Sequence, residues 1–310
     1  MKYFVVSDVH SFYVELKRAL DRAGFNKRNK DHTLIVCGDI FDRGPDTLSV
    51  YKFLISIPKK RCILIKGNHE LLYEELLEKS FPESHDFSNH TVDTFCQIAG
   101  YDPEILTPKY WRKFGDVPHE RIRQAWQEIL TEVKQSPITA WLQSDRWKYW
   151  HEVGNYIFVH SFIPLKNLDR MPAYYIYNRK FRYFKDWRET ATSFELEDAT
   201  WGCPYQQYID GYFKEEAANG KVLVCGHWTV TDFRQHINNK WSEDTSIYKF
   251  ENIIGLDCGI WKYRDTKAYY HPQNVLVIDD KDFNKCYDQY GAELKDETSI
   301  PRIETVTEQN

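Results

Sequence analysis

Short runs of apolar residues, each bounded by polar residues or glycine, recur along the 310-residue chain. Runs of four to six large or β-branched apolar residues are typical of strands that are buried on both faces of a sheet. We therefore expect strands at KYFVV (2–6), TLIVC (33–37), RCILI (61–65), YIFVH (156–160), KVLVC (221–225), IIGLD (253–257) and NVLVID (274–279).

Helical patterns separate the first three of these strands. In FYVELKRALDRAGF, apolar residues recur every three or four positions, and Gly24 stands where the helix would end. Asp46 can cap a second helix that runs to about Ile57, and HELLYEELLEKS predicts a third. An alternation of strands and helices with short connections is the pattern of a mostly parallel, covered sheet, so the sequence predicts an α/β fold.

The regular alternation ends after Ser80. Residues 81–150 have no clear strand pattern but contain an amphipathic helix at 118–134, so we expect a helical cap there. Residues 161–200 are irregular and rich in aromatic and basic side chains, which we interpret as a lid. The polar residues from about 292 onward are expected to be frayed. We predict one domain over residues 1–310 that the cap and the lid interrupt.

Composition and charge argue against nucleic acids and membranes as partners of this protein. The chain is 42% hydrophobic and 28% charged, as ordinary globular proteins are, and its net charge of −5 gives no basic field that would favour a nucleic acid partner. We find no signal-peptide pattern and no run near the roughly 18 apolar residues that a spanning helix needs, so no membrane partner is expected. Seven cysteines without a CxxC pair suit a reducing compartment, and we expect a cytoplasmic protein.

Side chains that bind metal ions follow most of the predicted strands. The carboxyl ends of parallel strands meet at one edge of an open α/β sheet, where these side chains would come together. Carboxylate, amide and imidazole ligands without a thiolate suit manganese, iron or zinc. Six such ligands are too many for one catalytic ion but suit two ions that share a carboxylate. The six are Asp8, His10, Asp39, Asn68, His160 and His227.

Arg43 adds a phosphate-binding group to this set. Two metal ions about 3.5–4 Å apart can activate a bridging water and stabilise the oxygens of an in-line phosphoryl displacement. Arg43 in GDIFDRG offers a planar fork that suits phosphate oxygens. Taken singly, an Asp after a strand is usually a helix cap and a strand-end His is usually structural. Their occurrence together favours a single site.

The motifs resemble those of the calcineurin-like metallophosphoesterases, in the branch that holds phosphoprotein phosphatases and diadenosine tetraphosphatases. The family pattern GDxHG, GDxxDRG, GNHE, His-Gly-Gly and Gly-His is similar to SDVHS, GDIFDRG, GNHE, VHSF and CGHW in this chain. The resemblance covers roughly residues 1–75, 153–165 and 220–280. It implies a β-sandwich of two sheets flanked by helices, and phosphoester hydrolysis by a water that bridges two divalent ions.

The resemblance also implies a role for each site residue. The first ion would be bound by Asp8 and His10, both ions would be bridged by Asp39, and the second ion would be completed by Asn68, His160 and His227. The general acid that protonates the leaving oxygen would be His69, oriented by Asp42, while Arg43 would hold the substrate phosphate. We expect manganese, with iron or zinc as alternatives. Glu70 is read as a residue behind the ligands, at a helix start.

Three positions depart from the family pattern. Ser7 and Ser11 replace glycines of the first motif, and Ser11 can cap the following helix. The family usually supplies a second phosphate-binding arginine before the last histidine motif, but DATWGCPYQQY contains Trp201 and no arginine. Arg182 and Arg188 are the candidates to replace it.

Two substrate classes remain open. The first is a phosphomonoester, such as a serine/threonine phosphoprotein, and the second is a dinucleoside polyphosphate of the diadenosine tetraphosphate type. The aromatic and basic side chains of residues 166–188 could stack on a base and hold a phosphate chain, or could pack the insertion onto the core. A non-catalytic binding module is disfavoured because every ligand position is present, and a calcineurin-like nuclease because His227 lacks the usual Gly-His-x-His context.

Overall fold

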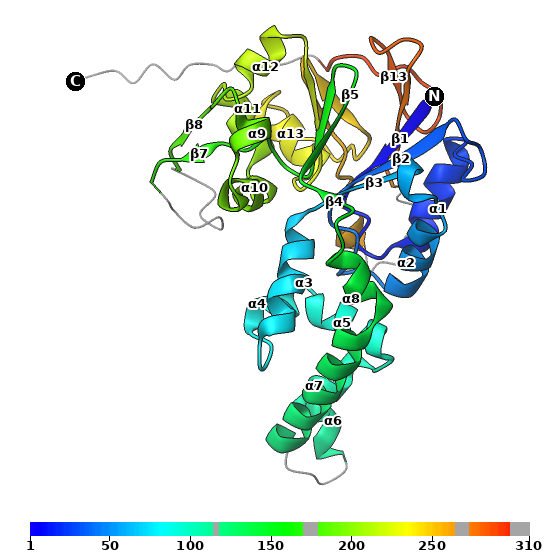
Figure 1. Ribbon diagram of the computed structural model, residues 1–310, viewed down its shortest axis with the longest axis vertical. Helices are drawn as coiled ribbons and strands as arrows, with labels where there is room; N and C mark the ends of the chain where they lie inside the picture. Colours follow the sequence, from blue (N-terminus) through cyan, green and yellow to red (C-terminus); the bar gives the residue numbers. More distant parts are fainter. Residues whose placement is uncertain (114–117, 170–178, 264–272, 298–310) are drawn as a thin grey trace.

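The computed structural model describes residues 1–113, 118–169, 179–263 and 273–297 (Figure 1). Its strands are β1 (Lys2–Val6), β2 (His32–Cys37), β3 (Cys62–Ile65), β4 (Trp147–Lys148), β5 (Trp150–Val153), β6 (Tyr156–Val159), β7 (Lys166–Asn167), β8 (Phe181–Arg182), β9 (Val222–Cys225), β10 (Tyr248–Phe250), β11 (Ile253–Gly255), β12 (Leu276–Asp279) and β13 (Cys286–Tyr287). Each of the seven strands expected from the sequence is present.

The helices lie between and outside these strands. They are α1 (Tyr13–Arg22), α2 (Thr47–Ile55), α3 (Asn68–Glu78), α4 (Ser84–Ser88), α5 (Thr91–Ala99), α6 (Pro108–Arg112), α7 (Pro118–Gln135), α8 (Pro137–Leu142), α9 (Trp187–Thr190), α10 (Ser193–Thr200), α11 (Pro204–Ile209), α12 (Lys214–Ala218) and α13 (Val230–His236). Short 3₁₀ turns stand at Lys59–Arg61, Pro103–Leu106 and Ile260–Tyr263. The helices predicted after β1, β2 and β3 and at 118–134 are confirmed as α1, α2, α3 and α7.

Two sheets form the centre of the molecule. One has six strands in the order β13-β12-β1-β2-β3-β4, and the other has five in the order β10-β11-β9-β6-β5. Strands β1 to β4 run parallel, as do β6, β9 and β11. Antiparallel pairing occurs toward the edges, where β12 joins β1, β13 joins β12, β5 joins β6 and β10 joins β11. The parallel strands bring their carboxyl ends to the site described below.

The side chains of the central strands alternate between two buried environments. Val5 of β1 and Val224 of β9 belong to one cluster, which lies between the two sheets. Phe4 of β1 packs instead with the helices outside the first sheet. Leu223 of β9 packs with the helices outside the second. This alternation gives layers of helix, sheet, sheet and helix, which confirms the predicted α/β sandwich (Figure 1).

Four short strands at the sheet edges were not predicted. They are β13 and β4 in the first sheet and β10 and β5 in the second. The expectation that residues 81–150 lack strands is therefore wrong at Trp147–Lys148, where β4 pairs with β3, and at Trp150, where β5 begins. An edge strand has a neighbour on one side only and is not buried on both faces, so its sequence shows no apolar run.

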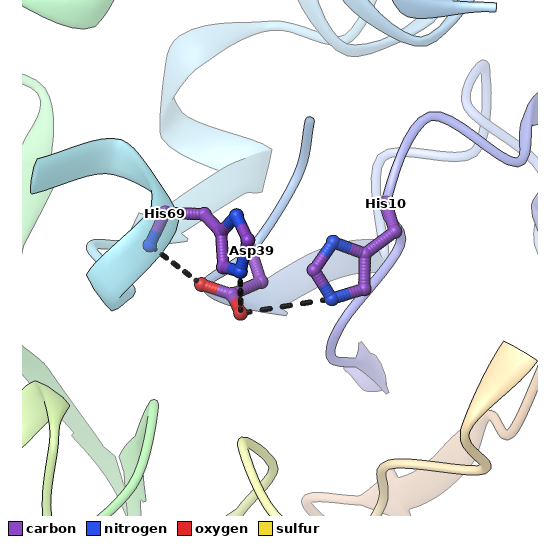
Figure 2. Close-up of side chains that lie close together, drawn as sticks. All are labelled: His10, Asp39 and His69. Carbon is purple, nitrogen blue, oxygen red and sulfur yellow. Dashed lines mark hydrogen bonds and ion pairs between the residues drawn. The ribbon is translucent and has the colours of Figure 1, made fainter. Parts of the chain in front are cut away.

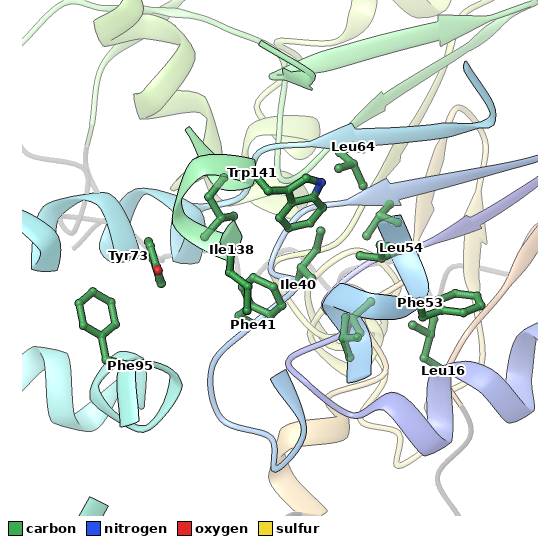
Figure 3. Packing of buried hydrophobic residues seen from close by; sticks show 14 of the residues in the cluster. Leu16, Ile40, Phe41, Phe53, Leu54, Leu64, Tyr73, Phe95, Ile138 and Trp141 are labelled. Atoms are coloured by element: carbon green, nitrogen blue, oxygen red, sulfur yellow. The ribbon is translucent and has the colours of Figure 1, made fainter. Parts of the chain in front are cut away.

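The helical segment between α4 and α8 extends as an elongated group away from the sheets but packs on the same core (Figure 1). Phe95 of α5 lies against Tyr73 of α3, with ring centroids 4.8 Å apart, and stacks on Trp126 of α7 at 5.6 Å. Trp141 of α8 covers Phe41, which follows β2 (Figure 3). That residues 1–310 form one domain, with a cap and a lid, stays a prediction.

The end of the described chain is packed against the second sheet. The N–H of Glu297 donates to the Lys249 carbonyl at 2.9 Å, and its carboxylate accepts a hydrogen bond from Arg234 at 2.6 Å. The expectation of fraying is wrong for residues 292–297, whereas residues 298–310 lie outside the described part. Among the described residues, the helices are all too short or too polar to cross a membrane.

Candidate metal centre and active site

The other five predicted metal ligands gather around the carboxylate of Asp39. Asp39 follows β2, and its Oδ2 lies 3.7 Å from Nε2 of His10, which follows β1 (Figure 2). Its Oδ1 lies 3.3 Å from Nε2 of His160, which follows β6. The carboxylate therefore lies between ligands supplied by both sheets.

Two groups of ligand atoms share Asp39. One group is His10, Asp39 and His69, the other is Asp39, His160 and His227, and the ligand atoms of each lie within 4.8 Å of one another. In the second group, Nε2 of His160 lies 2.9 Å from Oδ1 of Asn68 and 3.2 Å from Nδ1 of His227. The arrangement suits two ions with Asp39 between them.

Asp8 lies beside the second group. Its carboxylate accepts a hydrogen bond from the His227 backbone N–H at 3.1 Å. A Cβ placed on Gly226 would lie only 2.0 Å from Oδ2 of Asp8, so glycine is required for this close approach. The structure thus brings together all six residues that the sequence singled out.

Backbone carbonyls fix the orientation of two of the histidines. Nδ1 of His10 lies 3.0 Å from the Phe41 carbonyl, and Nδ1 of His160 lies 2.8 Å from the Cys37 carbonyl. A carbonyl can only accept, so each Nδ1 carries the proton and each Nε2 keeps a lone pair that can bind a metal ion. This is the usual way in which a protein prepares a histidine to bind a metal ion.

Glu70 organises the loop behind the ligands. Its carboxylate accepts hydrogen bonds from the backbone N–H groups of Gly67 at 2.7 Å, Ile40 at 2.9 Å and Asp39 at 3.0 Å. The loops after β2 and β3 are therefore joined through one side chain at the start of α3. This matches the position behind the ligands that the sequence predicted for Glu70.

The ligands concentrate charge in a buried place. Burial raises the pKa of Asp8 well above its usual value, and the negative charges of Asp257 and Asp39 raise it further. Burial also raises the pKa of Asp39 and of Asp257. For His10, burial and then the charge of Arg43 lower the pKa well below its usual value. Divalent cations would offset the cost of these buried anions and bind neutral imidazoles, so the residues fit a two-ion centre.

The backbone of the ligand loops lies in an unusual conformation. Positive φ angles between 48° and 70° occur at several site residues, namely Asp8, His10, Ser11, Asp39, Asp42, Arg43 and His227. Side chains other than glycine rarely adopt this left-handed region, and such strain gathers at functional sites, where the surroundings enforce it. The loops after β1, β2 and β9 therefore turn sharply to direct their side chains at one point.

His69 and Asp42 form a buried pair next to the ligands. Nδ1 of His69 lies 2.6 Å from Oδ2 of Asp42. Nε2 of His69 is buried, has no hydrogen-bond partner among the described residues, and lies 3.9 Å from Oδ2 of Asp39 (Figure 2). A carboxylate behind an imidazole favours its protonated form, and the free nitrogen faces the ligands. The pair has the geometry of a general acid and the residue that orients it.

Arg43 and three tryptophans surround the ligands. The guanidinium of Arg43 lies 3.3 Å from Nε2 of His10 and stacks over the ring of Trp261, 4.7 Å from its centroid. The rings of Trp201 and Trp228 lie 6.4 Å and 6.3 Å from the ring of His227. Arg43 is therefore a cation next to the ligands, within reach of a phosphate, with an aromatic ring below its guanidinium.

The structure does not support Arg188 as the missing phosphate-binding arginine. Its guanidinium donates to both carboxylate oxygens of Glu216, at 2.8 Å and 3.0 Å, and also pairs with Glu152. Two carboxylates already satisfy this guanidinium. Arg182 lies on the exposed side of the short ribbon β7-β8.

The described part of residues 166–188 is mostly packed and paired. The side chains of Phe181, Phe184 and Trp187 pack in the cluster outside the second sheet. The ammonium of Lys166 pairs with Glu195 at 2.6 Å, and Arg179 pairs with Asp198. For these residues, the packing interpretation is favoured over a nucleotide clamp, while residues 170–178 lie outside the described part.

Sequence reasoning missed several residues of the site. Asp257 ends the predicted strand IIGLD but was not counted among the site residues, although its charge acts on Asp8. Thr91 and Thr94 of α5 donate hydrogen bonds to Asp42 from about fifty positions away, and no local pattern indicates this. Ser11 does not cap α1 as expected, because its hydroxyl bonds to that of Thr47 at 2.9 Å.

Comparison with known proteins agrees with this geometry. A sequence model of the calcineurin-like phosphoesterases matches residues 1–261. The symmetrical bis(5'-nucleosyl)-tetraphosphatase of Buchnera aphidicola subsp. Schizaphis graminum (strain Sg) is 41% identical over 71 residues, which are 23% of this chain and 25% of that protein. The enzyme of the same name from Legionella pneumophila (strain Lens) is 38% identical over 87 residues, 28% of this chain and 30% of that protein.

One solved structure shares the fold at low identity. The cold-active protein-tyrosine phosphatase of a psychrophilic Shewanella species superposes with a TM-score of 0.51 and 13% identity, over 94% of this chain and 79% of that one. At this identity the likeness concerns the fold alone. The matches to the tetraphosphatases span only about a quarter to a third of their length, so those matches do not transfer a substrate.

The fold and the two ligand groups that share Asp39 agree with the match to the model of the calcineurin-like phosphoesterases. The chain belongs to the calcineurin-like phosphoesterase family, whose members use a dinuclear centre of divalent metal ions.

Replacing Gly226 tests the close approach of Asp8. We expect Gly226→Ala to reduce the bound metal by about half, because the new Cβ would displace the Asp8 carboxylate. Elemental analysis of the purified variant after manganese loading measures the loss. The matched control is Gly255→Ala, whose Cβ would meet the Phe233 ring at an ordinary 3.4 Å. A Gly226→Ala protein with the full metal content of the parent would contradict the role of Asp8.

Proposed function

We propose that this protein hydrolyses phosphomonoesters at a centre of two divalent ions, with serine/threonine phosphoproteins as the substrate class. The observation that carries the proposal is the buried Nε2 of His69. It faces the carboxylate shared by both ligand groups, with Asp42 behind it. A proton donor beside paired metal ligands suits cleavage of an ester whose leaving oxygen must be protonated.

The ligands divide between two ions in this proposal. Asp39 would hold both ions, the first with His10 and Asp8 and the second with Asn68, His160 and His227. The Asp8 carboxylate, which also accepts the His227 N–H, would then lie between the two groups. We propose manganese, because the donors are oxygen and imidazole. When bound, the two ions supply a nucleophilic water of lowered pKa and offset charge on the phosphoryl oxygens.

The other residues orient the substrate and move a proton. Arg43 binds the phosphoryl oxygens with its planar fork, and its guanidinium carbon lies over the Trp261 ring, 4.7 Å from the centroid. His69 donates the proton on Nε2 to the leaving oxygen. Burial and the charge of Arg43 lower the pKa of His69, whereas the adjacent Asp42 carboxylate favours the protonated imidazole.

The second candidate function is hydrolysis of dinucleoside polyphosphates. It is favoured by the names of the curated relatives and by the rings of Trp201, Trp228 and Trp261 around the ligands, on which a base can stack. It ranks second because Lys166, Arg179 and Arg188 are paired with carboxylates, which leaves these cations unable to hold a phosphate chain.

We also propose that the protein is cytoplasmic. All seven cysteines are buried and carry free thiols. Their thiols are free even where two cysteines lie in the same core cluster, as Cys37 and Cys286 do. A reducing compartment keeps thiols in this state.

A direct comparison of substrates decides between the two functions. We expect the manganese-loaded protein to release phosphate from a phosphoserine peptide more than about ten-fold faster than it cleaves diadenosine tetraphosphate, because carboxylates of the protein hold Lys166, Arg179 and Arg188. Phosphate release and nucleotide products are measured side by side, with Asp39→Asn as the site control. Faster cleavage of the dinucleotide would reject the phosphomonoesterase proposal in favour of the second candidate.

Two substitutions separate metal binding from acid catalysis. We expect both Asp39→Asn and His69→Asn to lower turnover by at least about 100-fold. Asp39→Asn should also lose bound metal, because the shared carboxylate is gone, whereas His69→Asn should retain it. Turnover of the phosphoserine peptide and elemental analysis give the two readings.

The controls for this pair are Asp145→Asn and His151→Asn. Asp145 is exposed and pairs with Lys59, and His151 lies on the edge strand β5. Both controls should keep the metal content and turnover of the parent. Loss of metal in His69→Asn would instead make His69 a ligand of the first group.

A further inference from the structure

Helix α5 of the inserted helical segment contacts the general-acid pair from behind. The hydroxyl of Thr91 donates to Oδ2 of Asp42 at 2.8 Å, and the hydroxyl of Thr94 donates to Oδ1 at 2.6 Å. The Thr94 hydroxyl also accepts the backbone N–H of Asp42 at 3.0 Å. Oδ2 of Asp42 in turn meets Nδ1 of His69. Each oxygen of the carboxylate is therefore held by a different threonine.

These hydrogen bonds are fully enclosed. Thr91 and Thr94 are buried completely, and Asp42 and His69 are 1% and 2% exposed. Water does not compete for the carboxylate, so its orientation depends on the protein groups around it. A buried carboxylate oxygen without a partner would be costly, which gives each hydroxyl a strong hold on the rotamer of Asp42.

The helix itself is fixed on both sides. Gln97, three positions after Thr94, accepts the Thr47 N–H at 2.9 Å and donates to the Gly44 carbonyl at 3.0 Å. Next to this row, Phe95 lies against Tyr73 (Figure 3) and stacks on Trp126. Thr91, Thr94 and Gln97 recur every three positions, so one side of α5 follows the loop from Asp42 to Thr47.

We propose that Thr91 and Thr94 are positioning residues for proton transfer, which lock the Asp42 carboxylate in the orientation that aims Nε2 of His69 at the leaving oxygen. In this proposal, the helical segment that contains α5 supports the general acid from behind. This inference depends on the proposed function, because it assigns the threonines to the acid of that same reaction.

A purely structural role would have a different signature. Threonines that only attach α5 to the loop would, when replaced, lower the stability and affect all substrates alike. Threonines that position the acid affect substrates according to how much the leaving oxygen needs a proton. A nitrophenolate leaves with little protonation, whereas a phenolate or an alkoxide depends on it.

The experiment compares Thr91→Val and Thr94→Val with Thr91→Ser and Thr94→Ser in the full-length, manganese-loaded protein. Valine keeps the shape and removes the hydroxyl, and serine keeps the hydroxyl. We expect each valine variant to lower kcat for phenyl phosphate by about ten-fold, with a much smaller loss for p-nitrophenyl phosphate and unchanged KM. The serine variants should recover most of the rate, and elemental analysis should find the parent's metal content.

Two further measurements secure the interpretation. In an Asp42→Ala background, adding Thr91→Val should change turnover of phenyl phosphate no further, because the hydroxyl acts through the missing carboxylate. Thr131→Val on α7, whose hydroxyl bonds only to the Gln127 carbonyl, is the control for the same substitution within a helix. If Thr94→Val does not fold, Thr91→Val still decides, because Thr91 does not hold the Asp42 backbone.

The outcomes separate this inference from the proposed function. Equal losses of turnover for phenyl phosphate and p-nitrophenyl phosphate would overturn the positioning role. A further loss of turnover when Thr91→Val is added to Asp42→Ala would overturn it as well. Neither result would contradict the proposed phosphatase function. A parent protein that hydrolyses neither aryl phosphate nor the phosphoserine peptide would overturn the proposed function itself.

Discussion

The structure depends on the burial of several carboxylates and imidazoles around one point. Burial raises the pKa of Asp8, Asp39 and Asp257, and the charges of Asp257 and Asp39 raise that of Asp8 further. Buried anions are costly unless cations or hydrogen bonds compensate them, and divalent cations would do so here. The strained loops, the glycines and the enclosing hydrogen bonds hold these groups together at one place.

Precise loops are needed because a metal ion accepts ligands only within a narrow range of geometry. Three devices provide this precision. Glu70 joins the loops after β2 and β3 through three backbone N–H groups. Backbone carbonyls set the tautomers of His10 and His160. The third device is the left-handed backbone of residues such as Asp39, which turns each loop sharply after its strand. Each device links a ligand to the end of a buried strand, so the two sheets restrict where the ligands can lie.

The sequence predicted the elements that are buried on both faces and missed those that are not. Strands β1, β2 and β9 pack between a sheet and a helical layer, so nearly every position is apolar and the run is easily recognised. The edge strands β4 and β5 lie in WKYWHEV, where half-buried and exposed residues mix. The same reason applies to the site. Its ligands lie in short motifs at strand ends, whereas the contacts of Thr91 and Thr94 depend on how α5 packs, which no local pattern encodes.

The distribution of cations bears on what distinguishes substrates. Arg43 stacks on Trp261 at the ligands, whereas Lys166, Arg179 and Arg188 are paired with carboxylates in the layer outside the second sheet. Lys262 is a second cation near the ligands, because its charge opposes the rise that burial causes in the pKa of Asp257 and its ammonium lies 5.7 Å from the centroid of the Trp261 ring. A phosphoryl group at the ligands would therefore meet cations that lie beside aromatic rings, whereas carboxylates of the protein already hold the cations of the outer layer.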